Sequence, residues 1–294
     1  MPESDAGASA PPAAAPLPAP WRWMPVQLLL LFLVLAAIDL ACQLLGAHLV
    51  HAVPAVLRDA AGLCAALFLS AAMIVAYRSL VRWLERRTAT ELQAANAARG
   101  LAQGIVAGAA LFALVYAILW GCSVVTFAGY GGLSGLGSAL AVAIASAVGE
   151  EIVFRGVVFR RLEEGLGTTI ALVISAVLFG LVHAGNRGAT WISTLAIVLE
   201  SGVLLGLVYT ATRSLWLPIG LHFGWNFTEG GIFGAAVSGG QNTGLIIAPL
   251  SGSSLTTGGA FGPEASLAAL IVSLCASAAL ACYVVRAGAW RSKR

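Results

Sequence analysis

The sequence predicts an all-α protein, a bundle of helices that crosses a membrane about eight times. Two observations predict this fold class. Hydrophobic residues make up 59% of the 294 residues and charged residues only 10%, whereas charged residues form about a quarter of an average globular sequence. The apolar residues also gather in stretches of about 20, the length that a helix needs to cross a bilayer. Most of the chain therefore has lipid as its solvent.

The spans divide the chain into four parts. Residues 1–20 are rich in Ala and Pro and are expected to form a disordered tail rather than a secretory signal, because no basic segment precedes the first apolar stretch. Residues 21–99 hold two N-terminal spans, anchored by Trp21 and Trp23, and a connector. A membrane domain at 100–285 and a basic tail at 286–294 follow. The spans are expected at about 26–48, 55–77, 101–127, 137–160, 168–184, 190–211, 215–234 and 266–286.

The distribution of basic residues predicts that both termini face the cytoplasm. Basic residues gather in the connections after the second and fourth spans and in the C-terminal tail, whereas the Gly-rich segments 129–137 and 238–265 have none and are expected to be flexible exterior loops. Arg58 and Arg187 fall on the other side. The basic residues of the three cytoplasmic segments are Arg78, Arg82, Arg86, Arg87, Arg99, Arg160, Arg161, Arg286, Arg291, Lys293 and Arg294. The Ala, Gly and Arg content suggests a multi-pass protein of a bacterial inner membrane.

The connector at 78–99 allows two interpretations. Leu80, Trp83 and Leu84 alternate with arginines as they would in an amphipathic helix on the cytoplasmic membrane surface. A solvated connector without regular structure explains the same residues.

Several classes of function find no support in the composition. The net charge of +3 is scattered along the chain, so no basic surface for nucleic acid is expected. The five cysteines have no metal-ligand spacing and are interpreted as small apolar side chains. The Gly-rich segments lack the GKS or GKT ending of a phosphate-binding loop. Membrane lipid and a peptide or protein substrate are the expected partners.

The first candidate cluster lies in the fourth span, where ionisable residues are costly and therefore suggest function. Glu151 and Arg155 are four residues apart, share a helical face and are expected to pair. Glu150 points about 100° away and has no local partner, which suits a general base. The alternative is a structural network of two acids and an arginine.

The second cluster ends in His183, near the end of the fifth span. The turn between the fourth and fifth spans is marked by Gly165 and Gly167, and its centre lies about 16 residues from both Glu150 and His183. Residues equidistant from the turn of an antiparallel hairpin lie at the same height. The spacing therefore predicts that Glu150 and His183 are level within the membrane.

The third cluster is His222 and Asn226 in the seventh span, again four residues apart on one helical face. An imidazole and an amide side by side could hold the oxyanion of a tetrahedral intermediate. The alternative is a polar pair that joins neighbouring helices.

Three more acids lie in spans without a clear role. Glu200, beside Gly202 and Gly206, could line a substrate path or bond between helices, and Asp39 is similar. Glu229 lies near the face of Asn226 and could support the site.

The segments EEIVFRG, FGLVH and HFGWN resemble the three motifs of the CPBP family, written EExxxR, FxxxH and HxxxN. This family comprises the type II CAAX prenyl proteases and the bacteriocin-processing proteins similar to lysostaphin resistance protein A. All three motifs occur in the family's order within residues 150–226, and the resemblance extends over roughly residues 100–285. It implies an intramembrane endopeptidase with a site formed by the fourth, fifth and seventh spans.

The resemblance implies a role for each matching residue. Glu150 would activate water, helped by His183, and Glu151 would support it, held by Arg155. His222 and Asn226 would stabilise the oxyanion. A further matching residue, Phe179, would pack beside the site. Eukaryotic relatives act on prenylated C-terminal tails, and the substrate class of this chain stays open.

Two alternatives remain at this point. Glu150, His183 and His222 could bind Zn²⁺ with an open fourth position, as in a metalloprotease, although a mechanism without a cofactor is favoured because His222 has Asn226 as a partner. The chain could also be a non-catalytic scaffold, a bacteriocin-immunity protein or a transporter that uses its buried carboxylates for protons.

Overall fold

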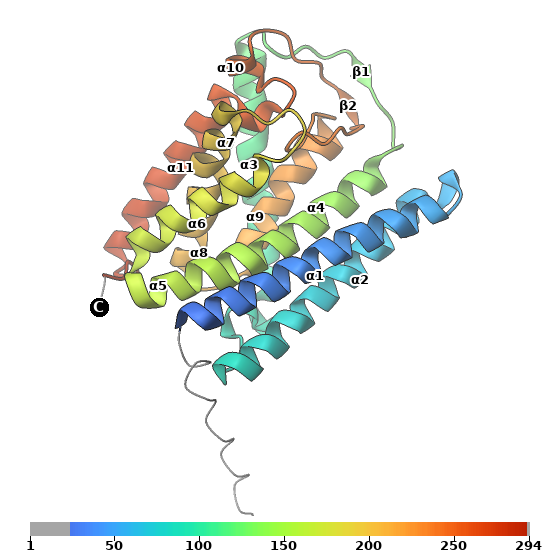
Figure 1. The fold of residues 1–294 in the computed structure, drawn as a ribbon. Coiled ribbons are helices and arrows are strands. Elements are labelled where there is room, and N and C mark those ends of the chain that lie inside the picture. The colour runs from blue at the N-terminus through green and yellow to red at the C-terminus, as the bar shows by residue number, and fades with distance from the viewer. Residues whose placement is uncertain (1–23, 293–294) are drawn as a thin grey trace, which may run out of the picture.

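The computed structural model describes residues 24–292 and consists almost wholly of helices (Figure 1). The expected tail at 1–20 and the expected anchors Trp21 and Trp23 lie outside the described residues. The α-helices are α1 (Met24–Ala52), α2 (Arg58–Leu80), α3 (Ala97–Gly121), α4 (Leu136–Glu151), α5 (Arg160–Leu166), α6 (Thr168–His183), α7 (Trp191–Ile197), α8 (Val203–Thr212), α9 (Trp216–Asn226), α10 (Ser254–Thr257) and α11 (Leu267–Arg286). Short 3₁₀ turns are η2 (Ala55–Leu57), η4 (Thr90–Leu92), η5 (Ala94–Asn96) and η9 (Pro263–Ala265).

Six helical segments in the described part of the chain are long and apolar enough to cross a membrane. They are Pro25–Ala52, Ala55–Glu85, Ala94–Gly121, Leu136–Leu166, Trp191–Thr212 and Leu267–Arg286. The prediction of an all-α membrane bundle is therefore confirmed, and the two remaining expected spans correspond to shorter helices. The 16 residues of α6 extend about 24 Å, less than the roughly 30 Å of a bilayer core, so α6 ends inside the bundle.

Figure 1 shows α1, α2 and α4 side by side, with α3 and α9 behind α4, and with α6 and α11 on the side of α4 away from α1 and α2. We call the end of the bundle that holds the start of α1 and the end of α11 the terminal end. The opposite end, which holds the turn between α1 and α2 and the strands, is called the loop end.

A close crossing of α3 and α9 fixes the height of α9. Gly104 and Gly108 of α3 face Gly220 and Gly224 of α9. A Cβ atom at Gly108 would lie 2.1 Å from the carbonyl oxygen of Leu221, and the other three glycines would meet main-chain oxygens at 2.3–2.5 Å. The two backbones therefore touch through a small-residue contact of the kind that packs membrane helices. Since His222 lies between Gly220 and Gly224, this contact holds it in place.

Four stretches of π-helix interrupt or extend the α-helices, namely η3 (Val81–Glu85), η6 (Ile152–Phe159), η7 (Val198–Gly202) and η8 (Phe227–Ile232). Such segments are rare and are frequent at functional sites. Here η6 begins directly after Glu151, η7 contains Glu200, and η8 begins directly after Asn226. Two of the three motif helices thus change their winding at the motif.

The connector at 78–99 is neither of the two forms expected for it. The helix continues only to Glu85, Arg86 adopts a left-handed conformation, and short turns follow. The connector is instead packed against α5 by ion pairs, since Glu85 bonds Arg87 and Arg160, and Glu91 bonds Arg87. These buried partners draw the segment onto the bundle, which an amphipathic helix on the membrane surface would not permit.

The Gly-rich segments meet at the loop end. Strands β1 (Gly129–Tyr130) and β2 (Ile246–Ile247) pair in antiparallel fashion, with Gly129 opposite Ile247. The rest of the second segment folds back over η8, where Oε1 of Glu229 accepts a hydrogen bond from the backbone N–H of Glu264 at 3.2 Å. The segments are thus tied to each other and to the bundle.

Candidate active site

Glu150 and His183 face each other across α4 and α6. Oε2 of Glu150 lies 3.7 Å from Nε2 of His183, so the sequence prediction that the two residues are level agrees with the structure. This distance is longer than a hydrogen bond. Oε2 of Glu150 is buried and has no hydrogen-bond partner among the described residues, although the side chain as a whole is 22% exposed. The carboxylate therefore has capacity to accept a proton.

The backbone of α6 sets the protonation of His183. Its Nδ1 atom lies 2.7 Å from the carbonyl oxygen of Phe179. Because a carbonyl oxygen only accepts, Nδ1 must carry a proton, and the neutral ring then presents the lone pair of Nε2 to Glu150. Two acceptors thus face one another at a distance too long for a shared proton, and a water molecule to one side of both could donate a hydrogen bond to each.

Glu151 is fully buried, and both of its hydrogen-bond partners contact its Oε1 atom, whereas its Oε2 atom has no partner among the described residues. Its Oε1 atom accepts a hydrogen bond from Arg155 at 2.8 Å, which is the expected pairing. Arg155 also donates to the carbonyl oxygen of Ser201 at 2.7 Å and lies 4.4 Å above the ring of Phe179. The arginine thus compensates the charge of Glu151, and Glu150 is left without an arginine.

His222 bonds Glu151 rather than Asn226, the partner expected for it. Nδ1 of His222 lies 3.1 Å from Oε1 of Glu151, on the opposite side of the site from His183. The ring of His222 therefore contacts α4, and the joint role of His222 and Asn226 as donors to an oxyanion stays a prediction. Nε2 of His222 points away from Glu151 and donates a hydrogen bond only when the ring carries both protons.

Asn226 is held by a residue that the sequence analysis did not single out. Nδ2 of Asn226 donates to Oγ of Ser146 on α4 at 3.2 Å. The second N–H of the amide is free for another acceptor. Ser146 lies four residues before Glu150, so its position on the face of Glu150 could have been found from the helical spacing.

Phe179 lies at the centre of these contacts, as the motif resemblance implies. Its ring centroid is 4.7 Å from that of His183 and 6.3 Å from that of His222. A further aromatic ring, that of Phe154, meets it edge-on at 5.0 Å. The ring separates the buried Glu151 and Arg155 pair from His183.

Of the three acids without a clear role, Asp39 lies beside the site on the side of α1, and Glu200 is next to Ser201, whose carbonyl oxygen accepts from Arg155. The carboxylate of Asp39 is packed against the backbone of Gly149, since a Cβ atom there would lie 2.1 Å from Oδ1 of Asp39. Glu200 and Glu229 are buried, and the Oε2 atoms of both have no hydrogen-bond partner in residues 24–292. Glu229 belongs to the contact with Glu264 at the loop end, described above.

The arrangement does not fit the zinc site considered as an alternative. Within residues 24–292, no three His, Cys, Asp or Glu side chains are arranged to hold a metal ion. His222 directs Nδ1 to Glu151, which in turn binds Arg155. We derive no metal-dependent step from these residues.

Comparisons with known proteins agree with the motifs. Residues 132–228 match the family described as type II CAAX prenyl endopeptidase Rce1-like. The predicted family resemblance is confirmed. The matched segment begins before α4 and ends in η8, so it contains every motif residue, whereas α1, α2 and α11 lie outside it.

One curated relative supports the same assignment. The Bacillus subtilis (strain 168) protein named "Putative membrane peptidase YdiL" is 33% identical over 90 residues, which is 30% of this chain. The chain spans about a third (34%) of the length of that relative. No solved structure matches the chain.

Proposed function

We propose that the chain is an intramembrane endopeptidase in which Glu150 activates a water molecule. The observation that carries this proposal is the unequal environment of the two adjacent glutamates. An Oε2 atom without a partner occurs in both residues, but Oε1 of the fully buried Glu151 is bound to Arg155 and His222, whereas Glu150 is 22% exposed and faces Nε2 of His183 at 3.7 Å. A carboxylate that is partly exposed and not held by an arginine can reach a water molecule and act on it as a general base.

The reaction consists of two proton transfers around one addition. A water molecule beside Glu150 and His183 gives a proton to the carboxylate of Glu150, and its oxygen bonds to the carbonyl carbon of the substrate. The tetrahedral intermediate then collapses as its C–N bond breaks, and the leaving nitrogen takes the proton from Glu150. His183, whose Nε2 lone pair faces the same space, orients the water.

The negative charge of the intermediate requires donors on the side of the carbonyl oxygen. Nε2 of His222, in the doubly protonated ring beside Glu151, is one donor. The free N–H of Asn226 is the other. The removal of a single donor of this kind typically slows a reaction by about 10²–10³-fold.

The arrangement of Arg155 argues against a non-catalytic scaffold or an immunity protein. A purely structural pair needs one carboxylate for one arginine, and a second carboxylate in the same span without a bonded partner adds only cost. Arg155 bonds the fully buried Glu151 and leaves Glu150 without a hydrogen bond from it.

We also propose that both termini, and with them the basic terminal end of the bundle, face the cytoplasm. Three arginines at the terminal end form ion pairs there. They are Arg87 with Glu91, Arg160 with Glu85, and Arg291 with Glu163. Reporter fusions at Arg294 and at Gly132 would report opposite sides of the membrane. The same side for both would overturn this orientation.

The experiment that tests the function is cleavage of a panel of quenched peptides, prenylated and unmodified, by purified protein in detergent. Wild type is compared with Glu150→Gln and His222→Ala, and with Trp191→Phe at an exposed position as control. Cleavage by wild type and the control, and its loss in both site variants, supports the proposal. Equal cleavage by Glu150→Gln and wild type would overturn it.

A further inference from the structure

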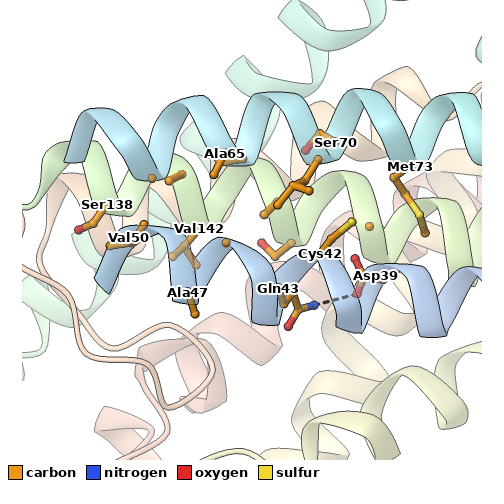
Figure 2. Close-up of a pocket in the computed structure, with 18 of the residues that line it drawn as sticks. Asp39, Cys42, Gln43, Ala47, Val50, Ala65, Ser70, Met73, Ser138 and Val142 are labelled. Atoms are coloured by element: carbon orange, nitrogen blue, oxygen red, sulfur yellow. Dashed lines mark hydrogen bonds between the residues drawn. The ribbon is translucent and has the colours of Figure 1, made fainter. Parts of the chain in front are cut away.

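A cavity of about 570 Å³ lies between α1, α2 and α4 and ends at Glu150 (Figure 2). Each of the three helices contributes one face of about three turns. On α4 this face runs from Ser138, near the loop end, to Glu150, over 12 residues or about 18 Å. The cavity thus runs from the loop end to the proposed base. Two of its three walls, α1 and α2, lie outside the segment that matches the family.

The middle of the cavity is apolar and lined with small side chains, whereas its mouth at the loop end carries His51, Arg58, Asp59 and Ser138. Gly46 of α1 and Gly62 of α2 keep this lining small, and a Cβ atom at either would meet only side chains, at 3.5 Å or more, which is ordinary van der Waals contact. This contrasts with the glycines of α3 and α9, where the backbones touch. Ala65 and Ala141 continue the small lining.

The inner half carries hydrogen-bonding groups that are not saturated. Gln43 donates to Oδ2 of Asp39 at 2.8 Å, which leaves the carbonyl oxygen of Gln43 as an acceptor (Figure 2). Oγ of Ser70 is buried and has no partner among the described residues, and the same holds for Oε2 of Glu150. Buried polar atoms without partners are uncommon and require an explanation.

We propose that this cavity binds an extended apolar segment of the polypeptide substrate next to the bond that is cleaved. The inference rests on the proposed function. A peptide unwound from its helix exposes backbone N–H and C=O groups, which need partners inside a membrane. Asp39 and Gln43 accept from its N–H groups, and Ser70 donates to a carbonyl oxygen. At about 3.3 Å per residue, 18 Å of cavity holds about five extended residues.

The polar inner half distinguishes a peptide from a lipid chain. An acyl chain would fill the apolar middle of the cavity equally well, but it would leave the acids and hydroxyl of the inner half without partners at a cost of about 1–3 kcal/mol for each buried group. The small lining of the middle favours substrate residues with branched or long apolar side chains. The occupant is therefore a peptide with apolar side chains.

Cys42 supplies a probe of this cavity that does not require activity. It lines the cavity, whereas the other four cysteines are exposed on the outside of the bundle and can be replaced by Ser. The protein with Cys42 alone, carrying Glu150→Gln so that no peptide is consumed, is treated with a water-soluble methanethiosulfonate reagent. The rate at which the reagent modifies Cys42 is measured without a peptide and with a short capped peptide of alternating Leu and Ala. A third measurement uses phosphatidylglycerol vesicles in place of the peptide.

The expected result is that the peptide slows modification of Cys42 several-fold. Ala65→Phe, which fills the cavity, should abolish this protection. In the protein with Glu150 intact, Ala65→Phe should raise KM for a quenched peptide that wild type cleaves by about tenfold, equivalent to about 1.4 kcal/mol. Ala71→Phe is the matched control, because Ala71 lies on the same helix but is exposed and does not line the cavity. Ala71→Phe should change neither the protection of Cys42 by the peptide nor KM.

Two results would overturn the proposal. Modification of Cys42 at the same rate with and without the peptide would do so, whether or not wild type cleaves the panel. Protection by the vesicles and not by the peptide would assign the cavity to a lipid chain. Protection by the peptide without cleavage by wild type would support the cavity as a peptide site while the proposed hydrolysis fails, so the two failures are distinguishable.

Discussion

Asn226 donates a hydrogen bond from Nδ2 to Oγ of Ser146, 3.2 Å away on α4, and this bond orients the amide toward the proposed base. Ser146 is thus a positioning residue. We expect Ser146→Ala to lower kcat for a cleaved peptide by about tenfold, less than the 10²–10³-fold expected for Asn226→Ala, with the thermal midpoint unchanged. Ser146→Thr should restore most of the loss, since it keeps the hydroxyl.

The control for this variant is Ser273→Ala on α11, where a buried hydroxyl has no partner in the described part of the chain and its removal should leave kcat unchanged. A fall in stability of Ser146→Ala that accounts for the whole loss of activity would contradict the positioning role.

Replacement of Glu150 should separate activity from stability. Glu150→Gln keeps the shape of the side chain and removes the atom that takes the proton, so we expect a loss of cleavage of at least about 10²-fold. Because Oε2 of Glu150 has no hydrogen-bond partner within residues 24–292, the unfolding midpoint in detergent should change little. Activity close to wild type would show that another group takes the proton.

Replacement of Glu151 should do the opposite and act first on stability. Glu151→Gln leaves the buried guanidinium of Arg155 without its counter-charge, and the loss of one partner of a buried pair costs about 3–5 kcal/mol. The double variant Glu151→Gln with Arg155→Met should recover part of this free energy, because no unpaired charge remains. Denaturant unfolding in detergent measures both.

Glu164→Gln serves as the control for Glu151, because Glu164 is 36% exposed in its pair with Arg161. A change below about 1 kcal/mol is expected there. Equal effects at the two glutamates would show that burial of the Arg155 pair has no special weight.

Chelation tests the choice of a mechanism without metal. Dialysis of the purified protein against EDTA and then 1,10-phenanthroline should leave the rate of peptide cleavage unchanged. Activity lost on chelation and restored by Zn²⁺ would move Glu150, His183 and His222 to the role of ligands and would overturn the water activation proposed for Glu150.

The connector at the terminal end should make stability depend on pH. Burial alone would raise the pKa of Glu91, but hydrogen bonds from Arg87 and Tyr77 outweigh it, so the pKa lies below the ordinary value of 4.5. A lowered pKa means that Glu91 stabilises the fold above pH 4.5 and that this contribution is lost as the pH falls below that value.

Thermal unfolding between neutral pH and about pH 4 tests this dependence. Wild type should lose more stability over this range than Glu91→Gln, in which position 91 does not titrate. Parallel curves for the two proteins would contradict the assignment to Glu91.

The sequence predicted those parts of the site that depend on contacts within one helix or one hairpin. The pairing of Glu151 with Arg155 follows from their spacing of four residues, and the approach of Glu150 to His183 follows from equal distances to a turn. Composition predicted the all-α membrane bundle for a similarly general reason, since apolar segments of this length have few other solutions in lipid.

The parts that the sequence did not predict depend on packing between helices distant along the chain. The bond of His222 to Glu151 follows from the rotation of α9 against α4, which the contact with α3 sets. The position of Asp39 beside Gly149 depends on the side of α4 that α1 occupies. The folded connector depends on buried ion pairs of Arg160, whose partner Glu85 lies 75 residues away in the sequence. The spacing of residues within one helix contains no information on these contacts between helices.

The spacing of the glycines in α3 affects the chemistry of the site, although α3 contributes no residue to it, because α3 holds α9 in position. Insertion of one residue between Gly104 and Gly108 would rotate the second glycine by about 100° and separate the two backbones over half of the contact. α9 would then shift, and His222 would leave Glu151 although every motif residue is intact. Natural relatives with all three motifs but a different spacing in this helix are therefore candidates for loss of activity, and transplanting the motifs into another bundle would require transplanting α3 with them.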